Sequence, residues 1–108
     1  MSENELLAAV LDLARVYGWK TYHARPAMTA KGYRTPVQGD GKGFPDLLMV
    51  KGDKVVIAEL KAEKGKTTPE QDAWLAALYY HCDNEPMVWR PEQWHDGTIL
   101  KTLSEIDA

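Results

Sequence analysis

The chain has 108 residues, 44% of them hydrophobic and 27% charged, and its 13 Lys and Arg against 16 Asp and Glu give a net charge of -3. This length allows one compact core, so we expect a single domain over residues 1–108. No segment approaches the ~20 consecutive apolar residues of a membrane helix. No signal peptide is visible, so we expect a cytoplasmic protein without membrane contact.

The first part of the chain predicts a helix, a strand and a loop. Ser2 and Glu5 have the spacing of a capping box, the apolar residues that follow recur at helical spacing, and Gly18 ends the helix. Bulky and polar residues alternate over 19–24, which predicts a strand. Residues 25–43 contain two prolines and four glycines without periodicity. We therefore expect a long loop there, of the kind that is usually functional or disordered.

Two apolar segments, 46–51 and 54–61, flank the dipeptide Gly52-Asp53, which is typical of a two-residue hairpin turn. The centres of both segments are apolar at consecutive positions. This pattern predicts two central strands that are covered on both faces of a sheet.

The helix expected next has clear start signals, with Thr68 as the cap, Pro69 in the first helical position and Gln71 three residues after the cap. Residues 85–90 predict a fourth strand that Pro91 ends, and 99–106 predict a short last helix. The element order indicates an α/β fold with a mixed central sheet flanked by helices. The expected buried stripe of the second helix consists of Gln71, Leu75, Leu78 and Cys82.

The net charge of the chain is unevenly distributed. Residues 20–66 carry ten basic and five acidic residues, a net +5, whereas residues 67–108 carry two basic and eight acidic ones, a net -6. A basic middle segment is typical of a face that binds a polyanion. A chance scatter of solvated charges explains the pattern equally well.

The hairpin register brings carboxylates together. If Gly52-Asp53 is the turn, Asp46 falls opposite Glu59, and period-two alternation places Lys61 on the same face. Opposed like charges on an apolar sheet are destabilising unless a partner such as a cation compensates them. The alternative is that Asp46 caps a turn and the other two are charges at the edge of the sheet.

Oxygen ligands without a cluster of His or Cys favour Mg²⁺ or Mn²⁺ over zinc. A divalent ion held by carboxylates and facing a lysine suits attack of water on a phosphodiester. The residues alone therefore favour a metal-dependent phosphodiesterase, with Asp46, Glu59 and Lys61 at its centre.

The motifs resemble the PD-(D/E)xK nucleases, because a Pro-Asp pair ending at Asp46 precedes Glu59-Leu60-Lys61 by thirteen residues. Neighbouring segments narrow the resemblance to the VRR-NUC branch, the virus-type replication-repair nucleases, over nearly the whole chain. These segments are 43–47 (Gly-Phe-Pro-Asp-Leu), 58–61 (Ala-Glu-Leu-Lys), 65–71 (Gly-Lys-Thr-Thr-Pro-Glu-Gln) and 88–91 (Val-Trp-Arg-Pro).

This resemblance implies a restriction-endonuclease-like fold with an αβββαβ core and a Mg²⁺- or Mn²⁺-dependent endonuclease acting on branched or duplex DNA. It also implies a homodimer in a bacterial or phage-infected cell. Carried over by position, Asp46, Glu59 and the backbone carbonyl of Leu60 are metal ligands, and Lys61 is the catalytic lysine. A family glutamate on the first helix matches Glu3, which would be a further active-site residue and metal ligand.

Two further positions have competing interpretations. Glu5 competes with Glu3 for the helix glutamate, but the capping box explains Glu5, and the family's glutamine four residues after Glu3 is Leu7 here. Gln71 matches a family glutamine that supports the active site, and its cap with Thr68 explains it equally well.

Candidate DNA contacts are basic or aromatic residues near these motifs, although each is individually explained as solvated surface. The candidate contacts are Lys31, Tyr33, Arg34, Lys42, Lys64 and Lys66.

Two alternative functions remain. One is a binding or assembly module without turnover, and the other is an enzyme acting on RNA or nucleotides.

Overall fold

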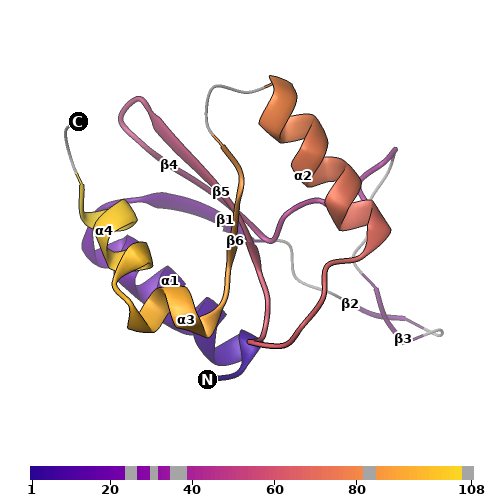
Figure 1. Cartoon of the computed structure of the whole chain (residues 1–108), viewed down its shortest axis with the longest axis horizontal. Helices are drawn as coiled ribbons and strands as arrows, with labels where there is room; N and C mark the ends of the chain where they lie inside the picture. The colour runs from indigo at the N-terminus through magenta and orange to yellow at the C-terminus, as the bar shows by residue number, and fades with distance from the viewer. Residues whose placement is uncertain (24–26, 30–31, 35–38, 82–84, 106–108) are drawn as a thin grey trace.

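The computed structural model describes residues 1–23, 27–29, 32–34, 39–81 and 85–105. These residues form a mixed four-stranded sheet in the order β1-β4-β5-β6, helices on both of its faces, and a separate two-stranded hairpin (Figure 1). The predicted α/β class with a mixed sheet is confirmed. The elements are α1 (Glu3–Val16), β1 (Lys20–His23), β2 (Ala27–Thr29), β3 (Gly32–Arg34), β4 (Leu47–Lys51), β5 (Lys54–Leu60), α2 (Pro69–His81), β6 (Met87–Trp89), α3 (Pro91–His95) and α4 (Thr98–Ser104).

The predicted capping box starts α1. The Glu5 N–H donates to the Ser2 hydroxyl at 3.0 Å, and the Ser2 N–H donates to the Glu5 carboxylate at 2.9 Å. These bonds satisfy two of the free N–H groups that every helix start exposes. Gly18 adopts a φ of 82° after the helix, a conformation that favours glycine.

The β4–β5 hairpin has the predicted register. Lys51 pairs with Lys54, Val50 with Val55, and the turn residue Gly52 has a φ of 60°. β1 pairs antiparallel with β4, and β6 pairs parallel with β5. The predicted hairpin strands are therefore the two central strands of the sheet.

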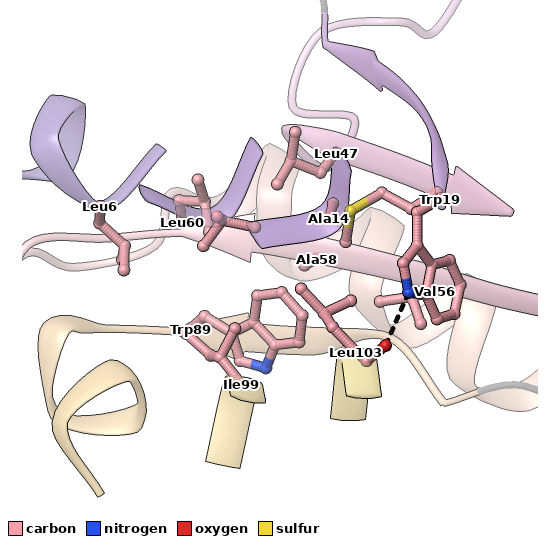
Figure 2. Packing of buried hydrophobic residues seen from close by; sticks show 12 residues of the cluster. Leu6, Ala14, Trp19, Leu47, Val56, Ala58, Leu60, Trp89, Ile99 and Leu103 are labelled. Carbon is pink, nitrogen blue, oxygen red and sulfur yellow. Dashed lines mark hydrogen bonds between the residues drawn. The ribbon is translucent and has the colours of Figure 1, made fainter. Parts of the chain in front are cut away.

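One face of the sheet packs against α1, α3 and α4 and forms the core (Figure 2). Trp19 extends across this core, and its indole N–H donates to the backbone carbonyl of Leu103 at 2.9 Å. This bond gives a buried indole the partner that it needs. The side chains of the core include Leu6, Val10, Ala14, Leu47, Met49, Val56, Ala58, Leu60, Trp89, Ile99 and Leu103.

The opposite face carries α2 (Figure 1), and none of the described α2 side chains is buried. Gln71, Leu75 and Leu78 are half-buried rather than buried, so the prediction overstated the burial of this stripe. The fourth predicted member, Cys82, lies outside the described residues. The apolar residues of α2 surround the helix, and Tyr80 is 77% exposed. The half-buried positions share one face of α2, but apolar residues also occupy its exposed faces, so the helix lacks a strong apolar stripe.

One further expectation is wrong. Residues 25–43 are not simply a loop, because β2 and β3 pair antiparallel within that range and extend away from the larger sheet (Figure 1). The fourth strand ends before Pro91 as predicted, but Pro91 also begins α3, a helix that was not predicted, where the Arg90 N–H donates to the Gln93 side chain at 2.8 Å. Three-residue strands and a five-residue helix are too short to produce a periodic pattern. Across the described ranges, no helix is long and apolar enough to cross a membrane.

Candidate functional site

The predicted carboxylate pair lies at the end of the central hairpin. Leu47 pairs with Ala58, so the next position along the hairpin sets Asp46 opposite Glu59. Asp46 is half-buried, and its Oδ2 accepts a hydrogen bond of 2.8 Å from the Leu60 N–H. Asp46 is therefore anchored to the backbone of the strand that carries its partner.

Glu59 is a buried acid, with 1% of its surface exposed. Burial raises its pKa to about 9, and a hydrogen bond with Asp46 and the negative charges of Asp46 and Glu3 act in the same direction. The positive charge of Lys61 lowers this pKa, but not enough to offset the other effects. These effects favour the protonated form of Glu59 near neutral pH.

The carboxylate oxygens of this site are suitable ligands for a hard divalent cation. The Oε2 atom of Glu59 is buried and has no hydrogen-bond partner among the described residues. Such an orphaned carboxyl oxygen is costly unless a ligand engages it. Carboxylate oxygens are the donors that Mg²⁺ and Mn²⁺ prefer. Asp46 and Glu59 thus supply two suitable donors.

A third carboxylate does not complete this pair. Glu3 is exposed in the first turn of α1, near enough for its charge to raise the pKa of Glu59. In the part of the chain that the structure describes, no group of three or more His, Cys, Asp or Glu side chains is placed to hold a metal ion. The Leu60 N–H points to Asp46, and the C=O of an extended residue points to the same side. That direction is consistent with the predicted role of the Leu60 carbonyl.

Lys61 follows directly after β5. Its N–H donates to the Trp89 carbonyl at 3.0 Å, which continues the parallel pairing with β6 by one residue. Alternation along the strand places its half-buried side chain on the face of Glu59, in agreement with the effect of its charge on that acid. The structure therefore brings Asp46, Glu59 and Lys61 together.

The loop before Asp46 packs tightly against the start of α2. A methyl group added at Gly43 would lie 2.6 Å from the Glu70 backbone, so only glycine allows this approach. The Phe44 and Trp74 rings meet edge to face at 5.0 Å, and the Trp74 indole N–H donates to the Asp40 carbonyl at 2.7 Å. These contacts fix the beginning of α2 beside the loop that carries the site.

Gln71 takes part in the predicted cap of α2. Its side-chain oxygen accepts from the Thr68 N–H at 2.9 Å, and its own N–H donates to the Thr68 hydroxyl at 3.2 Å. The Gln71 side-chain oxygen thus accepts its hydrogen bond within the cap. Among the described residues, no hydrogen bond joins Gln71 to Asp46 or Glu59.

The predicted DNA contacts divide into three groups. Lys42, Lys64 and Lys66 are exposed on the two segments that flank the carboxylate pair. Tyr33 and Arg34 belong to β3, in the separate hairpin. Lys31 lies outside the described residues.

Sequence reasoning missed Arg90 and Gly65. The Arg90 Nη2 donates to the Gly65 carbonyl at 2.9 Å and links the end of β6 to the segment after Lys61. Both residues lie in segments that carry the resemblance to known nucleases, but nothing in the sequence pairs them. A shallow depression lies apart from the carboxylate pair and holds none of the predicted residues; it is lined by Glu63, Glu92, His95 and Asp96.

The chain was compared with models of known protein families, with characterised proteins and with solved structures, and none of the three comparisons found a match.

Proposed function

We propose that the protein is a Mg²⁺- or Mn²⁺-dependent endonuclease that hydrolyses phosphodiester bonds in DNA. The observation that carries this proposal is the buried Glu59, whose Oε2 lacks a partner among the described residues and which faces Asp46. A protein that only needed a stable sheet would gain by replacing this pair with apolar residues. The pair is therefore best explained by a cation that takes the place of the proton on Glu59.

In this proposal Asp46, Glu59 and the Leu60 carbonyl would hold the ion. A bound divalent ion polarises a phosphoryl oxygen and lowers the pKa of water. Lys61 orients the attacking water or stabilises the negative charge that develops on the phosphoryl group. Glu3 lies in the first turn of α1, and its charge adds negative potential to the site.

The proposal also covers the fold family, the preferred DNA structure, the oligomeric state and the contacts with phosphates. The hairpin register and the order of the motifs support a restriction-endonuclease-like domain of the VRR-NUC kind. We propose a preference for branched DNA and a homodimer, because one chain offers one such site and cutting both strands of a junction needs two. Lys42, Lys64 and Lys66 are exposed next to the site and suit contacts with phosphates.

Cleavage assays with purified protein test the proposal. Labelled branched and linear DNA are incubated with Mg²⁺, with Mn²⁺ and with a chelator. We expect metal-dependent cutting that Lys61→Ala and Asp46→Asn reduce by about 10²-fold or more, a typical loss for a group that stabilises the transition state. Lys101→Ala, an exposed lysine on α4, is the matched control and should retain full activity.

The alternative class is a nucleic-acid-binding or assembly module without turnover. Such a module would bind DNA equally well with and without chelator and would cut nothing. The same assay with RNA as substrate separates an RNA-directed enzyme from the proposed one. Metal-independent binding without cleavage of either nucleic acid would reject the nuclease proposal.

A further inference from the structure

The segment after Lys61 folds back onto the lysine. The Gly65 N–H donates to the Ala62 carbonyl at 3.0 Å, which closes a tight turn. A methyl group added at Gly65 would lie 3.6 Å from Cδ of Lys61, so the turn lies beside the aliphatic stem of that side chain. The position of this turn therefore limits where the Lys61 ammonium group can lie.

The end of β6 holds both sides of this turn. The Trp89 carbonyl accepts from the Lys61 N–H at 3.0 Å, and the next residue, Arg90, donates from Nη2 to the Gly65 carbonyl at 2.9 Å. The backbone of Arg90 is itself fixed, because its N–H donates to the Gln93 side chain at 2.8 Å. One rigid strand end thus carries the guanidinium group that fixes the turn.

Stability alone does not account for an arginine here. The Nη1 atom of Arg90 is buried and has no hydrogen-bond partner among the described residues. Burial of an unpaired charged donor is costly. The Gly65 carbonyl lies in a half-buried turn, where water offers an alternative donor. An apolar side chain of similar length would avoid the cost at Nη1.

We infer that Arg90 is a positioning residue for the reaction: it clamps the Gly65 turn and thereby holds the ammonium group of Lys61 toward the carboxylate pair. This inference rests on the proposed function, in which Lys61 acts on the reacting phosphate. It adds a residue that does not itself touch the substrate. Loss of the clamp leaves Lys61 in place but frees its side chain to move.

The test compares Arg90→Met with Arg90→Lys, and uses Arg15→Met as the matched control. Arg15 is exposed on α1 and pairs only with Asp12 among the described residues. We expect Arg90→Met to lower kcat by about tenfold to a hundredfold, the effect of misplacing a catalytic group by about 1 Å. KM should stay within about twofold, and Tm should be unchanged or higher. Arg90→Lys keeps one donor and should recover part of kcat, and Arg15→Met should behave as wild type.

A readout that does not need activity separates this inference from the proposed function. Lysines are labelled by reductive methylation with ¹³C, and the Lys61 signal is assigned by its loss in Lys61→Arg. We expect Arg90→Met, but not Arg15→Met, to move the Lys61 signal toward that of exposed lysines. If the wild type does not cut DNA, the nuclease proposal fails, and the Lys61 signal alone then shows whether Arg90 holds the Lys61 side chain. An unmoved Lys61 signal, an unchanged kcat, or a fall in kcat matched by a fall in Tm would overturn the inference.

Discussion

The two faces of the central sheet differ in polarity and in how fully their side chains are buried. The face toward α1, α3 and α4 is apolar and closed, with Leu6, Val10 and Leu103 fully buried. The face toward α2 carries Asp46 and Glu59, and none of the α2 side chains that the structure describes is buried. The first face supplies the burial that stabilises a small domain. The second face holds a buried acid, which lowers stability.

The closed face of the sheet supplies stability, and the face toward α2 carries the candidate site. Strands β4 and β5 contribute side chains to both faces, so the same rigid hairpin forms the core and aims the carboxylates. Sites built on strands hold their geometry more closely than sites on loops. We therefore expect variants on the closed face to change unfolding and variants on the face toward α2 to change cleavage.

The largest expected loss of stability is on the closed face. Leu103→Ala removes a fully buried side chain and should lower the free energy of unfolding by about 2–5 kcal/mol. Chemical denaturation measures this loss. The control is Leu100→Ala on the same helix, which is 47% exposed and should cost less than about 0.5 kcal/mol. Equal effects of the two variants would contradict the assignment of the core.

The buried acid should make stability fall as pH rises. The pKa of Glu59 is about 9 in the folded protein, against 4.5 for a free glutamate. Between these values the folded state holds a proton that the unfolded state has released, so metal-free protein is most stable below about pH 4.5 with respect to this group and loses that contribution up to about pH 9. Thermal unfolding across this range measures the slope.

Glu59→Gln removes the titrating group and should flatten that part of the pH dependence. At pH 8 we expect a Tm about 5–10 °C above that of the wild type, together with loss of metal-dependent cleavage. Glu85→Gln, an exposed acid before β6, is the control and should retain the slope of the wild type. A Glu59→Gln variant less stable than the wild type at pH 8 would show that Glu59 is ionised and well paired.

A smaller effect is expected where the two regions meet at the start of α2. Gly43→Ala would place a methyl group 2.6 Å from the Glu70 backbone at a φ of 85°. Gly39→Ala has a similar φ of 65° and meets no atom of the described residues within 4 Å, so it shares the backbone strain without the clash. We expect Gly39→Ala to cost about 1 kcal/mol and Gly43→Ala to cost about 1–3 kcal/mol more, with reduced cleavage. Equal costs and equal activity would show that the contact with α2 does not support the site.

Local signals made much of the fold predictable. The two capping boxes and the Gly52-Asp53 turn each depend on neighbouring residues, and each is present as expected. The turn then fixed which carboxylates face each other, because strand pairing propagates from a turn without further information. Asp46 and Glu59 were predictable for this reason.

The remainder depends on tertiary contacts that no local pattern encodes. Arg90 and Gly65 are 25 residues apart, and Trp74 reaches back 34 residues to Asp40. Sequence spacing predicted Lys61 on the face of the carboxylate pair, but only the packed structure shows the Gly65 turn beside its side chain.

The central claim is that Asp46 and Glu59 share a divalent ion. Anomalous diffraction from crystals of the full chain grown with Mn²⁺ at pH 8 tests it most directly. We expect an anomalous peak within bonding distance of both carboxylates and of the Leu60 carbonyl, and its loss in Asp46→Asn. A map without a peak there at saturating Mn²⁺, or with a peak only at the exposed acids around Glu63 and Asp96, would contradict it.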